Sequence, residues 1–242
     1  MSNNSLLPVV IAGVNVLPFI SMEHVLETVF SEGGQIKPGM AVAVNPEKIL
    51  KAIEDNDTRS IINEAQFPYA DGIGVVKALE KKVNHRLSRV AGCELWLEIL
   101  TRSASFQSKV VLVGAKSAVV EGASQQLSAR GVNVVGYING YYESEQEVHD
   151  LLSETKPNIV IVALGSPKQE KLIKRLMSKH PNAFYMGVGG SFDVLTGAVE
   201  RAPQSWQNLN VEWLYRLVKE PKRLFRQLKL LKFVKMYILK QL

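Results

Sequence analysis

KVVLVGAKSAVVEGASQQLSARGVNVVGY, residues 109–137, is the stretch that decides the fold. It opens with an apolar run at 109–114, continues at 116–129 with apolar residues that recur every three or four positions, and ends in a second apolar run at 132–137. Strands that are apolar throughout are typical of parallel sheets covered on both faces, and an amphipathic stretch between them supplies a crossover helix. The stretch therefore predicts a strand, a helix and a second, parallel strand.

The same alternation extends along the chain in both directions. Further strands are expected at 9–13, 40–44, 158–164 and 183–188. Further helices are expected at 21–31, 46–55, 72–82, 92–104, 143–155 and 167–179. This order predicts an α/β fold with a Rossmann-like parallel sheet as its core, arranged in three layers.

The chain divides into a catalytic core, residues 1–202, and a C-terminal helical appendage, residues 203–242. Within the core, the regular alternation of 109–194 marks the Rossmann-like half, and residues 1–105 are expected to form a more irregular N-terminal lobe. The joint at 103–108 is too short for a flexible linker. We therefore expect the two lobes to pack as one unit.

The composition is that of a globular protein, but its charge is uneven. With 242 residues, 46% of them hydrophobic, the chain is long enough to bury a sizeable core. Residues 213–242 hold nine lysines and arginines against one acid, Glu220, and subtracting this +8 from the total charge of +6 leaves −2 for residues 1–212. Because the basicity belongs to the tail and no RNA-recognition signature occurs, a nucleic-acid partner is not expected.

The single cysteine, Cys93, excludes an internal disulfide and a cysteine zinc site. Its place in an apolar helical pattern favours packing over a nucleophilic role. The first 20 residues begin without charge and are interrupted by Asn15 and Pro18, unlike a signal peptide or a membrane span. No stretch predicts a transmembrane segment. The single cysteine fits a reducing cytoplasm, where we expect the protein.

The loops that follow the predicted strands are the expected place for a site, because ligands of open parallel sheets bind at the carboxyl ends of the strands. The segments placed there are Asn45, 114–116, 136–137, 165–170 and 187–193, and they include Gly114, Tyr137, Gln169, Glu170, Gly189, Gly190 and Asp193. Glycines in such loops let backbone N–H groups approach a phosphate, although a tight turn explains each loop equally well by itself. Neither GxGxxG nor GxxxxGK[ST] occurs, which argues against a standard dinucleotide or P-loop site.

Two charged residues outside those loops are further candidates. Asp71 stands in YADGIGVV, 69–76, where a helix is expected to begin. It is either an N-cap or a carboxylate that takes a proton from a hydroxyl group. Arg89 is either a surface ion-pair partner or a clamp for a phosphate or carboxylate. The four histidines are scattered and no DxD pair occurs, so no metal site is predicted.

Six segments, in order along nearly the whole chain, resemble the WecG/TagA/CpsF glycosyltransferases, glycosyltransferase family 26. They are Asn45-Pro46-Glu47, ADGIGVV at 70–76, RVAGCEL at 89–95, LGSPKQEK at 164–171, MGVGGSFDVLTGAVERAP at 186–203 and VEWLYRLVKEPKRLFRQ at 211–227. The chain looks most similar to the enterobacterial common antigen branch, the UDP-N-acetyl-D-mannosaminuronic acid transferases.

The resemblance implies an inverting transferase that needs neither a metal nor a cofactor. It would move N-acetyl-D-mannosaminuronic acid from UDP to undecaprenyl-diphospho-N-acetylglucosamine at the inner face of the cell membrane. Two alternatives stay open: a transferase of neutral N-acetylmannosamine from the same family, and a nucleotide- or lipid-binding module without catalysis.

The resemblance also implies roles for individual residues of the core. Asp71 would be the general base that deprotonates the acceptor hydroxyl. Gln169 and Asn45 would line the sugar and diphosphate pocket, with Arg89 nearby. Many relatives carry a threonine two residues before the asparagine, where this chain has Ala43, so a hydroxyl role at that place is not expected here.

The remaining implied residues bind the donor. Asp193 would help to hold the nucleoside. Arg216, Arg223 and Arg226 are similar to the arginines thought to close over the donor diphosphate. Arginines in these places can stabilise the departing UDP where other transferases use a cation.

The tail, RLFRQLKLLKFVKMYILKQL at 223–242, carries a basic residue at every third position from Arg223 to Lys235. A helix is expected from about 205 to 219 and a second one beyond Pro221. On a helical wheel Leu231 and Ile238 share the side of the leucines, whereas Phe233 and Tyr237 fall among the basic residues. This pattern is typical of peripheral association with an anionic membrane, with an oligomer contact as the alternative.

Overall fold

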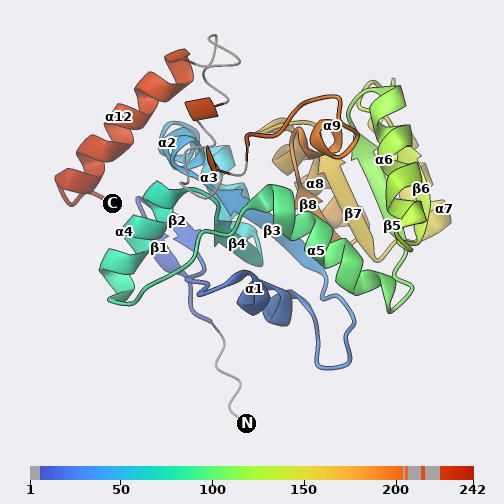
Figure 1. Ribbon diagram of the computed structural model, residues 1–242, viewed down its shortest axis with the longest axis horizontal. Coiled ribbons are helices and arrows are strands. Elements are labelled where there is room, and N and C mark those ends of the chain that lie inside the picture. Colours follow the sequence, from blue (N-terminus) through green and yellow to red (C-terminus); the bar gives the residue numbers. More distant parts are fainter. Residues whose placement is uncertain (1–5, 204, 207–213, 216–223) are drawn as a thin grey trace.

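The computed structural model describes residues 6–203, 205–206, 214–215 and 224–242 (Figure 1). Its centre is a six-stranded parallel sheet in the order β4-β3-β8-β7-β5-β6. The strands are β3 (Gly39–Val44), β4 (Phe67–Ala70), β5 (Val110–Gly114), β6 (Val134–Ile138), β7 (Ile159–Ala163) and β8 (Phe184–Gly187). The predicted α/β fold with a Rossmann-like parallel sheet is confirmed.

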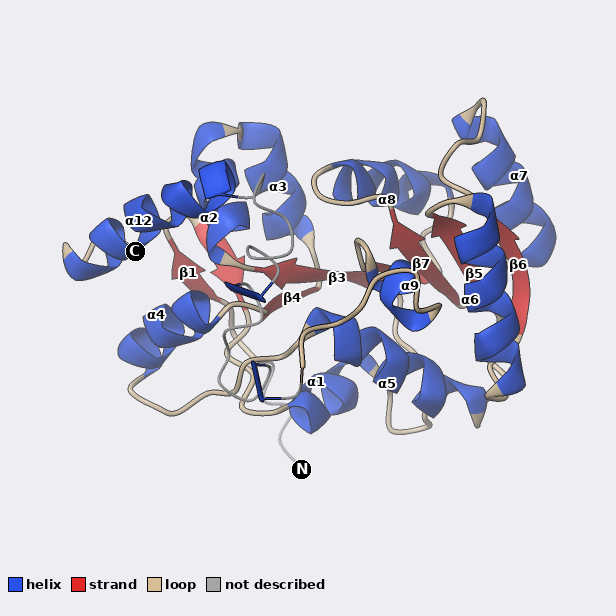
Figure 2. Ribbon diagram, turned by 45° about the horizontal axis from the view of Figure 1, so that its top comes forward, coloured by secondary structure: helices blue, strands red, loops and turns tan. Residues whose placement is uncertain are grey.

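Helices cover both faces of the sheet (Figure 2). They are α1 (Met22–Val29), α2 (Pro46–Glu54), α3 (Asn56–Glu64), α4 (Ile73–Val83), α5 (Gly92–Ala104), α6 (Ser117–Ala129), α7 (Glu145–Thr155), α8 (Lys168–Lys179) and the short α9 (Ser191–Leu195). Successive strand residues point to opposite faces. Val111 and Val113 therefore belong to one hydrophobic cluster, with residues of α2, α3, α4, α7 and α8, whereas Val110 and Leu112 belong to the other, with residues of α1, α5 and α6. One hydrophobic cluster lies on each face of the sheet, so the fold has three layers: helices, sheet and helices.

The sheet continues through both predicted parts of the core. β3 and β4 come from the expected N-terminal lobe and β5 to β8 from the Rossmann-like half, and the parallel pairing of β3 with β8 joins them. β6 lies on one side of β5, whereas β7 and β8 lie on the other. The loops after β5 and β7 therefore diverge, and such a point is where open α/β sheets form a ligand crevice.

The strand expected at 9–13 is shorter and lies outside the parallel sheet. β1 (Val9–Ile11) pairs antiparallel with β2 (Val14–Val16) in a separate two-stranded sheet. Ala12 and Gly13 between them both have positive φ, 48° and 80°. A two-residue connection with positive φ at both positions matches the right-handed twist of a hairpin.

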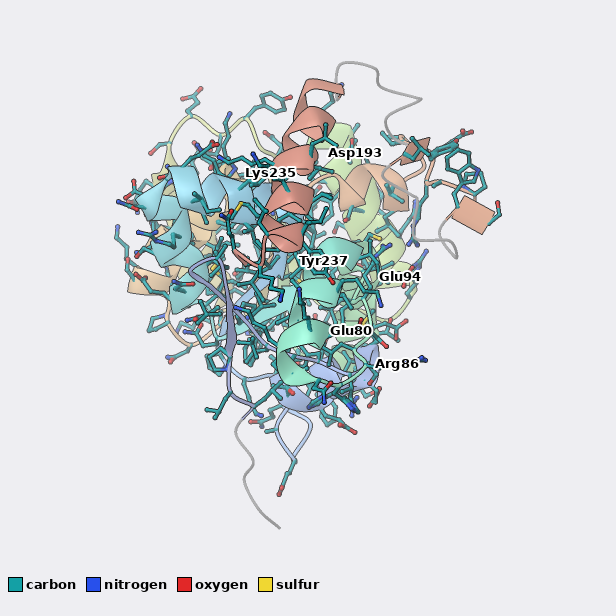
Figure 3. The ribbon with its side chains drawn as sticks, turned by 90° about the vertical axis from the view of Figure 1, so that its left-hand side faces the viewer. Glu80, Arg86, Glu94, Asp193, Lys235 and Tyr237 are labelled. Atoms are coloured by element: carbon teal, nitrogen blue, oxygen red, sulfur yellow. The ribbon has the colours of Figure 1, made fainter. Side chains whose placement is uncertain are left out.

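The C-terminal helix α12 (Leu224–Ile238) lies beside α2 at one end of the molecule (Figure 1). Phe233 is its buried anchor, close enough that a Cβ on Gly74 of α4 would lie 3.1 Å from the Phe233 ring. The Lys81 ammonium stands 5.1 Å from the centre of the Tyr237 ring, on the side of α12 that faces α4 (Figure 3). The helical wheel therefore correctly separates Phe233 and Tyr237 from Leu231 and Ile238. The side with Phe233 and Tyr237 packs on the body of the protein.

The opposite side of α12 is exposed. Leu231 is 65% and Ile238 70% accessible. Among the described residues, no helix has the length and apolarity needed to cross a membrane. Most of the helix expected at 205–219 lies outside the described residues.

Candidate active site

Asp71 lies at the carboxyl edge of the sheet, directly after β4. Val44 pairs with Ala70 in parallel register, so the next residues of the two strands, Asn45 and Asp71, begin neighbouring loops. The backbone N–H of Asp71 donates to the Val44 carbonyl at 3.0 Å. The β3 and β4 loops are thereby held together.

The Asp71 carboxylate points toward the start of α5. Its Oδ1 accepts a hydrogen bond from the backbone N–H of Gly92 at 3.3 Å, and Nε of Arg89 lies 3.9 Å from the same oxygen. The positive end of α5 and the guanidinium both stabilise the carboxylate form. The Asp71 side chain remains 27% accessible, so a substrate can reach it.

The alternative interpretation of Asp71, as the N-cap of the following helix, is wrong. The N-cap of α4 is Gly72, and no side chain makes a capping hydrogen bond there. Asn45 does serve as a cap, because its Oδ1 accepts from the backbone N–H of Lys48 at 2.9 Å in the first turn of α2.

A buried polar network joins the neighbouring loops. The Lys48 ammonium donates to Oε1 of Glu170 at 2.7 Å, with both side chains less than 8% accessible. Gln169 donates from Nε2 to the same Glu170 oxygen at 3.1 Å, and its own Oε1 accepts from the backbone N–H of Gly189 at 2.9 Å. A Cβ on Gly187 would lie 2.5 Å from Gln169 Nε2, so only glycine lets the amide approach the β8 loop.

Charge compensation keeps Glu170 ionised in this buried place. Burial by itself would raise its pKa, but the Lys48 ammonium and the hydrogen bonds from Lys48 and Gln169 more than offset that effect, so the pKa of Glu170 lies below its usual value. The pair is therefore a neutral unit of two charged groups at the sheet edge.

A hollow of about 630 Å³ lies at the diverging loops after β5 and β7. Its lining residues are Ala115, Lys116, Gly140, Tyr141, Tyr142, Ala163, Leu164, Lys168, Lys171, Leu172, Arg175 and Asp193. Four of them are cationic and one is acidic, which suits an anionic ligand.

The four cations of the hollow differ in their pairing. Arg175 makes a bidentate ion pair with Glu145, which raises the pKa of the arginine and lowers that of the glutamate. Within the described part of the chain, Lys116, Lys168 and Lys171 make no ion pair. These three ammonium groups are available to a ligand.

The structure brings most of the sequence-predicted residues to this edge. Asp193 lines the hollow, and Gly189 and Gly190 belong to the same β8 loop. Gly114 closes β5 onto β7 beside the hollow, since its φ is 115° and a Cβ would lie 2.4 Å from the Ala163 carbonyl oxygen. Tyr137 stands on the edge strand β6, 44% accessible, and is not among the lining residues.

Several residues of the site were not singled out from the sequence. Lys48 and the two aromatic residues Tyr141 and Tyr142 are the main ones. Tyr141 was missed because β6 and its turn run on beyond Tyr137. Lys48 directly follows Asn45-Pro46-Glu47, and its position next to that segment was the available signal.

The arginines predicted to cover the donor are not placed. Arg216 and Arg223 lie outside the described residues, and Arg226 belongs to α12 with its side chain outside the described part. Their role stays a prediction.

Comparison with protein families gives a match to the family described as glycosyl transferase WecG/TagA/CpsF, over residues 9–242. It spans the sheet, the Asp71 loop, the hollow and α12. Membership supports sugar transfer and implies a nucleotide-sugar donor and an acceptor. The chain therefore belongs to the WecG/TagA/CpsF family of glycosyl transferases.

Proposed function

We propose that the protein transfers N-acetyl-D-mannosaminuronic acid from UDP to undecaprenyl-diphospho-N-acetylglucosamine, with inversion and without a metal ion. The observation that carries the proposal is the Asp71 carboxylate, held accessible at the same sheet edge as a cationic hollow. Transfer of neutral N-acetylmannosamine is the second candidate. The donor sugar itself rests on the sequence resemblance.

The hollow at β5 and β7 is the proposed donor site. The UDP diphosphate would lie against Lys116, Lys168 and Lys171, with Asp193 toward the nucleoside. β7, on the near side of this crevice, is three strands away from β4. With about 4.8 Å for each inter-strand spacing, that distance is about 14 Å. An extended sugar nucleotide bridges such a distance, so its sugar would reach Asn45, Gln169 and Asp71.

Asp71 is the proposed general base. It takes the proton of the acceptor hydroxyl while that oxygen bonds to the anomeric carbon and the bond from this carbon to the UDP oxygen breaks. A single displacement inverts the anomeric centre. Lysines of the hollow, together with Arg216, Arg223 and Arg226, would stabilise the charge on the departing UDP.

The acceptor would be reached through docking of α12 on the cytoplasmic face of the membrane. Its outer side combines exposed Leu231, Val234 and Ile238 with Lys235, and exposed Lys240 follows the end of the helix. Apolar side chains enter the interface and lysines meet anionic headgroups, each contributing about 1 kcal/mol.

Replacing Asp71 with Asn tests the chemistry. Loss of a general base lowers turnover by about 10²- to 10⁴-fold. Sugar transfer by the wild type and by Asp71→Asn should be measured with UDP-N-acetylmannosaminuronic acid and with UDP-N-acetylmannosamine, in the presence of EDTA. Binding of UDP shows that the variant is folded. The exposed Asp57→Asn is the matched variant and should keep full activity. Undiminished transfer by Asp71→Asn, or none by the wild type, would refute the proposal.

Membrane docking has its own test. Sedimentation with anionic vesicles should recover the wild type, and Leu231→Gln with Ile238→Gln should stay in solution. Leu7→Gln, which changes another exposed leucine outside α12, is the control. Equal sedimentation of all three proteins would refute this part of the proposal.

A further inference from the structure

Tyr69 carries a buried hydroxyl group without a use in the fold. It lies in β4 with no accessible surface, and no hydrogen-bond partner of its hydroxyl occurs among the described residues. Burial raises the pKa of Tyr69 well above its usual value, and the Asp71 carboxylate acts in the same direction. The group is therefore a neutral O–H donor. An unpaired buried donor destabilises the fold, so its presence at a site needs a reason.

The hydroxyl lies next to the proposed base. Tyr69 and Asp71 are two residues apart, so their side chains point to the same face of the sheet. A Cβ on Gly92 would lie 2.7 Å from the Tyr69 oxygen and 3.5 Å from Oδ2 of Asp71. Both oxygens thus border one point at the first residue of α5. Asp71 uses its other oxygen, Oδ1, for the Gly92 N–H.

We propose that Tyr69 is a positioning residue for Asp71: its hydroxyl donates a hydrogen bond to the carboxylate when the carboxylate turns toward the acceptor hydroxyl. The inference rests on the proposed role of Asp71 as the base. Tyr69 itself transfers no proton. It holds one carboxylate oxygen so that the other faces the acceptor.

The moving partner in this step is the carboxylate. The tyrosine oxygen is fixed because the ring is fully buried and the hydroxyl packs on Gly92. Two contacts of the Asp71 carboxylate in this structure are long, 3.3 Å to the Gly92 N–H and 3.9 Å to Arg89 Nε. A small rotation of the carboxyl group exchanges them for the shorter, charge-assisted bond from Tyr69.

The other titratable groups around the hydroxyl do not take its hydrogen bond. Cys93 at the start of α5 and Glu170 of α8 disfavour the tyrosinate, as Asp71 does, and neither of the two is a hydrogen-bond partner of the hydroxyl in the described residues. A purely structural tyrosine at this place would be better replaced by phenylalanine, which has no orphan donor to bury.

Tyr185 offers a matched control within the same sheet. It is also fully buried, in β8, but its hydroxyl donates to the His180 carbonyl at 2.8 Å at the amino edge of the sheet, away from the site. Tyr185→Phe therefore removes a hydrogen bond, whereas Tyr69→Phe removes a hydroxyl donor that has no partner in this structure.

The experiment compares the two variants in the full chain, with UDP-sugar donor and lipid-linked acceptor. Tyr69→Phe should lower kcat about ten- to hundredfold, since a hydrogen bond to a charged group is lost. KM for the donor should stay at the wild-type value. The Tm should be equal to that of the wild type or higher. The acid limb of the kcat profile should move to higher pH, because the carboxylate loses a donor that favours its charged form. Tyr185→Phe should lower the Tm and leave kcat and the pH profile unchanged.

The outcomes separate this inference from the proposed function. If Tyr69→Phe keeps the wild-type kcat and pH profile while Asp71→Asn is inactive, the role of Tyr69 is overturned and the proposed base stands. A Tyr69→Phe variant that loses Tm as Tyr185→Phe does would show a structural tyrosine and overturn it too. Full transfer by Asp71→Asn would overturn the proposed base and this inference together.

Discussion

Removal of the Lys48 ammonium should be among the most destabilising single changes in the core. Lys48 and Glu170 form an ion pair at 2.7 Å and are 7% and 6% accessible. Lys48→Met keeps the length of the side chain but leaves a buried carboxylate uncompensated. Breaking a buried pair from one side costs about 3–5 kcal/mol. For a chain of this size each kcal/mol lowers Tm by about 2–4 °C, so the expected loss is about 6–20 °C.

A second variant separates loss of the pair from loss of packing. In Lys48→Met with Glu170→Leu both charges are gone, and such apolar replacements are often neutral or stabilising. The double variant should therefore recover most of the free energy of unfolding, measured by urea denaturation followed by circular dichroism. A single variant that costs less than about 1 kcal/mol, or a double variant no better than the single one, would refute this reasoning.

The same pair predicts a pH dependence. The pKa of Glu170 is lowered in the folded protein, so its unfolded form binds protons more readily. The pair's contribution is therefore complete above the usual glutamate pKa of 4.5 and is lost as the pH falls through the lower folded value. The double variant should lack this loss.

Three further predictions concern other parts of the molecule. Gly92→Ala should cost about 1–3 kcal/mol, because its Cβ would lie 2.7 Å from the Tyr69 oxygen, and Tyr69→Phe should relieve that cost in a denaturation cycle. Phe233→Ala should cost about 3–5 kcal/mol in the docking of α12 and make the tail the first site of tryptic cleavage, with the body left intact. Burial lowers the pKa of both His149 and His180, which stack at 5.4 Å, so unfolding by urea should become easier as the pH falls below about 6.5, and less so in His149→Phe.

Secondary structure with a long periodic pattern was predictable, and short or polar elements were not. α5 runs over Gly92–Ala104, as its pattern predicts. β4 was missed because it has four residues, one of them Pro68, and such a segment does not read as a strand. The sheet accepts the proline because β4 pairs with only one neighbour within it, β3. α3 was missed because its pattern, NDTRSIINE, is polar except for Ile61 and Ile62.

The site was predictable where it depends on strand ends and not where it depends on tertiary contacts. Asn45 and Asp71 lie at the sheet edge because each directly follows a strand. The apolar pattern predicts the strand before Asn45, and the YADGIGVV motif draws attention to Asp71. The partner of Lys48 is 122 residues away, and no periodicity connects the two. The same holds for the contact of Asp71 with α5, because the sequence does not state which helix begins beside β4.

The place of the Lys48–Glu170 pair bears on the proposed donor as well as on stability. α2 follows β3 and α8 follows β7, so the pair bridges the loops on either side of β8. Gln169 adds the β8 loop through Gly189. A sugar nucleotide lying from the β5–β7 hollow to Asp71 would pass over this network. A lone Glu170 carboxylate would repel its diphosphate, whereas the neutral pair does not. Lys48→Met should therefore weaken UDP binding more at low than at high ionic strength, since repulsion that reaches the site through solvent is screened by salt.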